Sequence, residues 1–172
     1  MKSEEAIRRK VKELLNDSKI TAPPVLVDQI AEHLNIKVQY APLQDDVSGL
    51  LYRENKSAVI GVNGLHSSVR QRFTIAHELG HYVLGRDGEF FLDRPVLFRS
   101  DKSRDENPEE EKDANAFAAE LLMPEEMVLE EIASIKYKEL ELEDAIKRLA
   151  RVFNVSMQAM LIRLQKLNLI PM

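Results

Sequence analysis

The sequence predicts an α+β fold, and three observations lead to this prediction. Apolar residues recur at helical spacing in several segments along the chain. Short runs rich in β-branched residues stand together between two of these segments, as expected for a small three-stranded sheet. The chain has 172 residues, of which 44% are hydrophobic and 31% charged, which is an ordinary globular mixture. These properties favour one compact domain, or a domain with a small extension, and exclude extensive disorder or a coiled coil.

Helices and strands can be placed along the chain from these patterns. The expected helices cover residues 4–15, 25–34, 67–84, 108–122, a segment after Pro124, 142–153 and 156–167. The expected strands are residues 36–40, 47–52 and 58–62, the last two joined by a hairpin turn at 53–56. Gly85 is placed to end a helix. Residues 86–108 are expected to form a long loop with a short strand near 96–98. We expect residues 1–135 to form the core with its N-terminal helices, and residues 136–172 a helical extension.

Composition excludes several classes of protein. The chain contains no cysteine, which rules out disulfides, iron–sulfur clusters and zinc sites built on thiolates, and which fits a cytoplasmic protein. Its apolar runs are too short to span a bilayer, and the first residues lack the apolar stretch of a signal peptide. The net charge is −5, so any contact with nucleic acid would have to be local.

The pattern HExxH is present within a predicted helix, as His77-Glu78-Leu79-Gly80-His81. Residues four apart differ by about 40° around a helix, so the two imidazoles project from one face with room for a metal ion. Imidazole ligands with one open position suit zinc. In such sites the glutamate does not bind the metal but acts on a water molecule as general base. The plain alternative is a surface helix with two histidines and a glutamate.

A catalytic zinc needs a third protein ligand, which here must be a carboxylate or another histidine. The acidic start of the predicted helix 108–122 can supply it. Glu111 is attractive because Asn115 lies one turn later on the same face and could orient a ligating histidine. Glu120 is the main competitor, and acids near a helix N-terminus can also simply complement its dipole. The other acids in this segment are Glu109, Glu110 and Asp113.

Two blocks of this sequence resemble the signature blocks of the ImmA/IrrE family of bacterial and phage HExxH metallopeptidases. The first is residues 72–81 with the HExxH pattern, and the second begins at Glu111 and ends in Leu121-Leu122-Met123-Pro124. The resemblance covers roughly residues 23–170. It implies a zincin-like, thermolysin-like minimal core, with zinc bound by His77, His81 and Glu111 and with Glu78 as the catalytic acid. Members of the family cut helix-turn-helix repressors or related regulators.

The C-terminal segment differs from the rest of the chain in charge. After Ala145 there are five basic residues and no acid, namely Lys147, Arg148, Arg151, Arg163 and Lys166. Residues 149–159 resemble a helix-turn-helix, in which Ser156 caps the second helix. A helical pair packed on the core explains the same pattern. Arg70 and Arg72, before the HExxH pattern, could attract an acidic substrate or could belong to a solvated helix face.

We therefore predict a zinc-dependent endopeptidase that cleaves a protein regulator, such as a helix-turn-helix transcriptional repressor in stress response or mobile-element control. The alternative is a non-catalytic zinc-containing regulator that binds DNA or a repressor through its C-terminal helices. A component of a phage or a toxin–antitoxin pair is a third reading. The expected partner is a protein substrate, with DNA as the second choice and no membrane, and the expected location is the cytoplasm.

Overall fold

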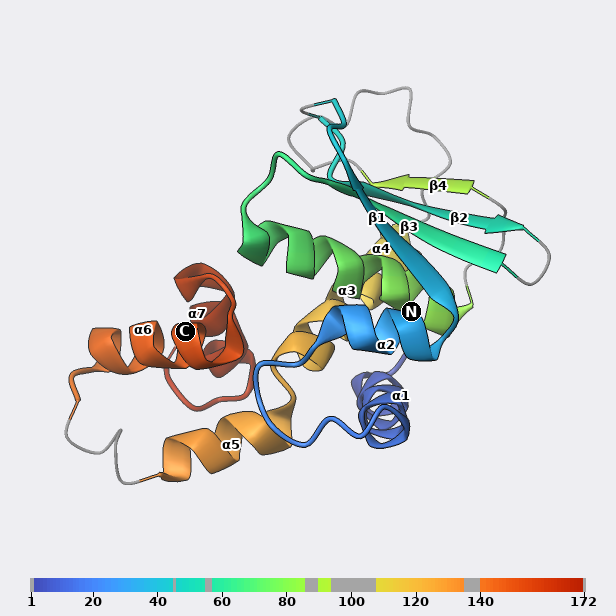
Figure 1. Ribbon diagram of the computed structural model, residues 1–172. Helices are drawn as coiled ribbons and strands as arrows, with labels where there is room; N and C mark the ends of the chain where they lie inside the picture. The colour runs from blue at the N-terminus through green and yellow to red at the C-terminus, as the bar shows by residue number, and fades with distance from the viewer. Residues whose placement is uncertain are drawn as a thin grey trace.

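The computed structural model describes residues 2–44, 46–54, 57–85, 90–93, 108–134 and 140–171. It has the predicted α+β fold, with the sheet lying over one side of a group of helices (Figure 1). In chain order the elements are α1 (Glu4–Asp17), α2 (Val27–His33), β1 (Ile36–Ala41), β2 (Gly49–Glu54), β3 (Ser57–Asn63), α3 (Ser68–Leu84), β4 (Phe90–Asp93), α4 (Pro108–Leu122), α5 (Glu125–Ala133), α6 (Leu142–Phe153) and α7 (Met157–Lys166).

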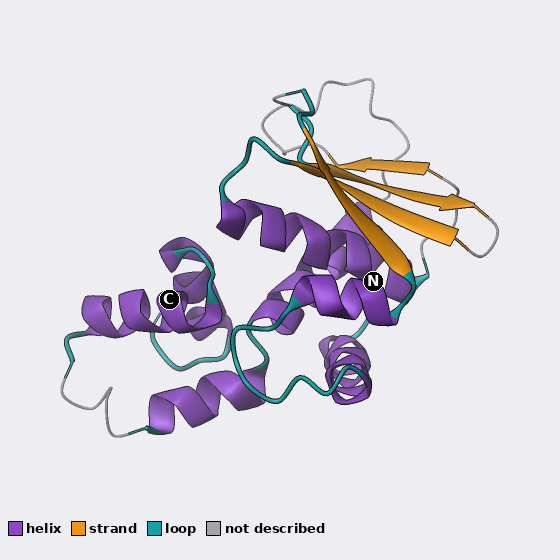
Figure 2. Cartoon of the chain, in the orientation of Figure 1, coloured by secondary structure: helices purple, strands orange, loops and turns teal. Residues whose placement is uncertain are grey.

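The sheet has four strands in the order β1-β3-β2-β4, where three were predicted (Figure 2). β2 pairs antiparallel with β3, which confirms the expected hairpin, although its turn at residues 55–56 lies outside the described residues. β1 joins β3 in parallel. The additional strand, β4, falls in the segment that we expected to be a loop, and it pairs antiparallel with β2. Its pairing partner lies about 40 residues earlier in the chain, so local pattern gave no sign of it. The short strand expected near residues 96–98 lies outside the described residues.

The helices follow the predicted periodicity closely. α4 and α6 begin and end at the predicted residues, and α3 ends at Gly85, which adopts a left-handed conformation with φ of 81°. α2 begins two residues later than predicted, at Val27. The carbonyl of Val25 instead accepts a hydrogen bond from the side chain of Arg72 on α3, at 2.9 Å.

α3 and α4 form the centre of the molecule, and α3 packs between α4 and the sheet (Figure 1). Fully buried apolar side chains from all three fill the interface: Leu51, Ile60, Ile75, Leu79, Phe117 and Leu121. Gly80 allows the two helices to approach closely, because a Cβ atom there would lie 3.1 Å from both Cα and O of Ala114. The core therefore holds α3 and α4 in close contact.

The C-terminal helices pack on this centre through polar as well as apolar contacts. Arg163 on α7 is buried, forms an ion pair with Glu120 on α4, and donates to the carbonyl of Met123 at 3.0 Å. The Arg72 side chain on α3 also donates to the carbonyl of Asn154, in the turn between α6 and α7, at 3.2 Å. Ser156 caps α7 as predicted, accepting from Ala159 N at 3.1 Å. The separation into a core of residues 1–135 and an extension of residues 136–172 stays a prediction.

Candidate metal centre

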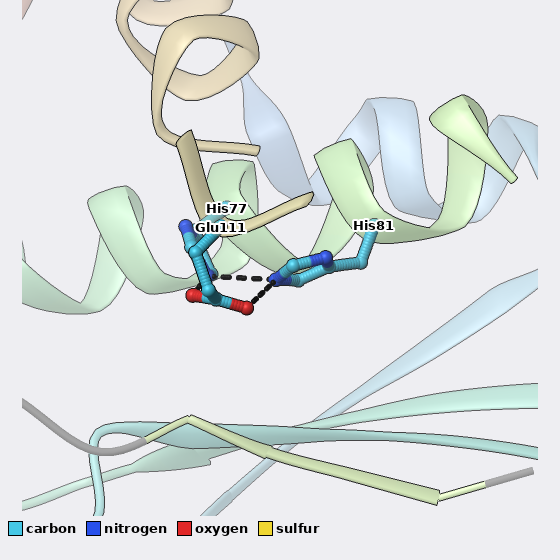
Figure 3. A group of neighbouring side chains, drawn as sticks. All are labelled: His77, His81 and Glu111. Atoms are coloured by element: carbon cyan, nitrogen blue, oxygen red, sulfur yellow. Dashed lines mark hydrogen bonds and ion pairs between the residues drawn. The ribbon is translucent and has the colours of Figure 1, made fainter. Parts of the chain in front are cut away.

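Three side chains from two helices meet beneath the sheet. His77 and His81 project from successive turns of α3, and Glu111 comes from the first turns of α4 (Figure 3). The Nε2 atoms of the histidines lie 2.9 Å apart, and Glu111 places Oε2 3.4 Å from Nε2 of His77 and Oε1 3.1 Å from Nε2 of His81. Ligand atoms of all three residues lie within 4.8 Å of one another. The sequence spacing thus produces a convergent group.

The three residues of this group are almost completely buried. His77 and His81 are each 3% exposed and Glu111 is 5% exposed. Burial by itself would raise the pKa of the Glu111 carboxyl, but hydrogen bonds and charge from His77 and His81 outweigh burial and hold that pKa well below its usual range. Glu111 is therefore a carboxylate, which is the protonation state required of a metal ligand.

The donor set fits a metal ion. Two imidazole nitrogens and one carboxylate, all directed at one point, are the protein ligands of many catalytic zinc sites, which keep a fourth position for water or substrate. The three residues could bind a metal ion without rearrangement of the helices, since their ligand atoms already converge.

Glu78 directly follows His77 on α3 and is 1% exposed. The first residue of β2 makes room for it. A Cβ atom on Gly49 would lie 3.6 Å from Oε1 of Glu78 and would overlap the methyl group of Thr74, so only glycine lets the strand approach α3 here. Sequence reasoning missed Gly49, because nothing in the local pattern shows that the start of β2 faces the HExxH helix.

The structure separates the acids that competed to be the third ligand. Glu111 faces the histidines, whereas Glu120 forms the ion pair with Arg163. Asp113 is buried but accepts hydrogen bonds from the backbone N–H of Lys2, at 2.9 and 3.1 Å. The role suggested for Asn115 was wrong. Its side chain is exposed and, among the described residues, makes no hydrogen bond to either histidine.

Two further side chains support the group from its flanks. Arg53 on β2 donates to the carbonyl of His81 at 3.2 Å, and its guanidinium lies 4.5 Å from the ring centroid of Tyr82. Phe73, one turn before His77, stacks on the His77 ring with 6.2 Å between centroids. Sequence reasoning missed Arg53, since a charged residue at a strand end is usually solvated. Spacing could have found Phe73, which precedes the first histidine by four residues.

Comparison with known protein families matches residues 31–165 to the IrrE N-terminal-like domain. The chain belongs to this family. The match includes both sequence blocks, and it confirms the resemblance drawn from them. The convergence of His77, His81 and Glu111 now has the context of a peptidase family.

Two similar proteins add further context. "Uncharacterized immunity region protein 2" of Bacillus phage phi105 is 31% identical over 101 residues, which are 58% of this chain and 60% of the phage protein. A solved structure titled "Mycobacterium tuberculosis transcriptional regulator" superposes with a TM-score of 0.62 and 18% identity, covering 94% of this chain and 46% of that one. The second likeness shows the fold alone. The matched part of the chain thus spans 60% of the length of the phage protein and 46% of the length of the solved one.

Within the described part of the chain, no helix is long and apolar enough to cross a membrane.

Proposed function

We propose that this protein is a zinc-dependent endopeptidase that cuts a protein regulator. The observation that carries the proposal is the buried convergence of His77, His81 and Glu111, together with the buried acid Glu78, which directly follows His77 on the same helix. A structural metal site needs no acid beside its ligands, whereas a hydrolytic site needs a base. The peptidase family of residues 31–165 supports the same reading.

Each residue has a defined role in the proposed reaction. His77, His81 and Glu111 would hold the zinc ion, which supplies Lewis-acid chemistry by polarising a scissile carbonyl and acidifying a water molecule. Glu78 accepts a proton from the attacking water and passes it to the leaving amine nitrogen. Gly49 keeps the first residue of β2 close to the Glu78 carboxyl, so that this side chain has little room to turn away. Burial of the group limits access by bulk water.

The proposed substrate is a transcriptional regulator, in particular a helix-turn-helix repressor. The similar phage protein is named for an immunity region, and the similar solved structure is titled a transcriptional regulator. These two printed names, an immunity region and a transcriptional regulator, support a regulator as the target of this chain. A cytoplasmic location agrees with such a target and stays a prediction.

The variant Glu78→Gln tests the proposal. An amide cannot take up the proton, so zinc content and thermal stability should stay as in the wild type while peptide cleavage falls at least about 100-fold. Zinc is measured by atomic emission, and cleavage by mass spectrometry of peptides from a denatured bacterial proteome. Glu110→Gln, one residue before Glu111, is the matched control and should retain cleavage. Full cleavage by Glu78→Gln, or a wild-type protein that binds zinc and cleaves nothing, would refute the endopeptidase.

The helix-turn-helix-like form of α6 and α7 favours a second candidate, a regulator that binds DNA. The turn is short, Asn154 adopts a left-handed conformation, and Ser156 caps the second helix. However, α7 exposes the apolar side chains of Met157, Leu161 and Ile162, whereas Arg163 is buried, which leaves Lys166 as the exposed cation of this helix. Phosphate contacts need exposed cations. Duplex binding that weakens steeply with salt, persists without zinc and is lost in Arg151→Glu/Lys166→Glu would support this candidate.

A further inference from the structure

One row of side chains on α3 extends from the metal centre toward the start of the helix. Arg70, Phe73, His77 and His81 follow one another at spacings of three or four residues, so they lie on one face. Phe73 precedes His77 by one turn, about 6 Å along the axis, and Arg70 precedes it by about 10 Å. A peptide bound at the metal centre and running along this face would meet Phe73 first and Arg70 next.

Phe73 has the properties of a surface that binds an apolar side chain. The residue is 37% exposed, although its ring stacks on the ring of the buried His77 at an interplanar angle of 26°. Most of the other large apolar side chains of α3 are in the core, such as Ile75 and Leu79. An exposed aromatic ring held against an imidazole of the metal centre offers apolar contact area, at a fixed position, to a side chain of a bound peptide.

Arg70 differs from the two other arginines near α3. Arg53 and Arg72 donate to backbone carbonyls, of His81 for the first and of Val25 and Asn154 for the second. Arg70 is exposed and donates to the hydroxyl of Ser48 at 3.0 Å. Within the described part of the chain it pairs with no carboxylate. A guanidinium has five N–H donors, so Arg70 retains donors for a ligand.

The contact between Arg70 and Ser48 also fixes where this guanidinium lies. Ser48 is 6% exposed and directly precedes Gly49, which borders Glu78. Its neighbours are held by Asn63, a fully buried side chain that donates to the carbonyl of Val47 at 2.9 Å. Arg70 is thus anchored to a rigid strand start that also touches Glu78, on the same side of α3 as the metal centre.

We propose that Arg70 and Phe73 determine which peptides this site binds: Phe73 receives an apolar side chain near the scissile bond, and Arg70 pairs with an acidic side chain two positions farther out. The inference rests on the proposed endopeptidase function and names its substrate class. An extended peptide advances about 3.3 Å per residue, and every second side chain lies on the same face. Side chains about two and four residues from the metal centre therefore face Phe73 and the long side chain of Arg70, whose Cα–Cβ bond tilts toward the start of the helix.

Fluorescein-labelled nonapeptides of alanine, with two positions varied, test this proposal. The varied position nearer the middle of the peptide holds Leu or Gly, and the one farther out holds Glu or Lys. The pair is placed on the N-terminal side of the middle in one set of peptides and on the C-terminal side in another. Binding to zinc-loaded Glu78→Gln protein is followed by fluorescence anisotropy. The Leu/Glu peptide should bind about tenfold more tightly than the Gly/Glu peptide and about fivefold more tightly than the Leu/Lys peptide. Adding Phe73→Ala should abolish the preference for Leu, and adding Arg70→Glu should reverse the preference for Glu.

Matched controls and a second assay separate the possible failures. Leu129→Ala on α5 and Arg151→Glu on α6 change an exposed leucine and an exposed arginine elsewhere, and they should leave both preferences intact. Phe73→Leu should retain the preference for Leu. Equal binding of all four peptides, or preferences unchanged in Phe73→Ala and Arg70→Glu, would overturn this inference. Cleavage of the same peptides by the wild type is scored separately: cleavage without preference overturns only the assigned specificity, whereas preference without cleavage overturns only the endopeptidase.

Discussion

Glu111 and Glu120 stand on the same helix, α4, and are 5% and 7% exposed, yet their surroundings differ completely. Glu111 faces two imidazoles, and Glu120 faces the guanidinium of Arg163. An imidazole has a lone pair to offer a metal ion, but a guanidinium has donors alone. Burial of a carboxylate therefore does not identify a metal site. The side chain that the carboxylate faces identifies the site, because it determines whether a second ligand atom is present.

The two sites also contribute to the molecule in different ways. The pair of Glu120 and Arg163 joins α4 to α7, and Arg163 further satisfies the carbonyl of Met123. Glu111 joins α4 to the face of α3 that carries His77 and His81. We infer that the pair of Glu120 and Arg163 holds the C-terminal helices in place, whereas Glu111 completes a group that could bind a metal ion. Substitutions in the pair of Glu120 and Arg163 should then change stability, and substitutions of Glu111 should change metal binding.

The largest effect on stability is expected from Arg163→Ala. This change leaves the Glu120 carboxylate buried without its cation, which should reduce the free energy of unfolding by about 3–5 kcal/mol. The double variant Glu120→Leu/Arg163→Met should recover most of that loss, because it removes both charges. Urea unfolding followed by circular dichroism measures both changes. A loss below about 1 kcal/mol in Arg163→Ala would show that the ion pair does not hold α7.

Metal binding should separate the two glutamates most sharply in matched amide variants. Glu111→Gln replaces a charged ligand with a neutral one and should weaken zinc binding about 100-fold or more. Glu120→Gln should bind zinc as the wild type does. Competition with a chromophoric chelator gives both dissociation constants. Equal affinity of the two variants would remove Glu111 from the ligand set.

A smaller effect is expected from Gly80→Ala, which acts on Glu111 through α4. The added methyl group would lie 3.1 Å from the backbone of Ala114, so α4 must shift by a few tenths of an ångström near Glu111. Alanine also favours a helix over glycine by about 1 kcal/mol, which offsets part of the packing cost. We expect zinc affinity to fall about tenfold with little change in stability. Unchanged zinc affinity would show that the site tolerates this shift.

Much of this fold follows from patterns within single elements. Periodicity placed α4 and α6 at their observed bounds, and the spacing of His77 and His81 brought their imidazoles together. The family resemblance selected Glu111, which the local pattern alone left in competition with Glu120. Both acids are buried on α4, so only their partners on α3 and α7 distinguish them.

The features that the sequence did not reveal all depend on contacts between distant segments. β4 pairs with β2, Gly49 meets Thr74 on α3, and Arg163 meets Glu120. Arg163 is one of the five bases of the C-terminal segment and is buried, although a charged side chain is usually on the surface. A single sequence gives residue types and local spacing, and it does not show which remote residue will neutralise a buried charge.

The side chain of Arg72 links the local unfolding of three segments. One guanidinium holds the carbonyls of Val25 and Asn154, so the entry to α2, the first half of α3 and the turn between α6 and α7 share a single donor group. Local unfolding that breaks the hydrogen bond to either carbonyl frees the Arg72 guanidinium, and the hydrogen bond to the other carbonyl depends on the same guanidinium. Amide hydrogen exchange in these three stretches should therefore proceed as one cooperative unit, although they are far apart in the chain.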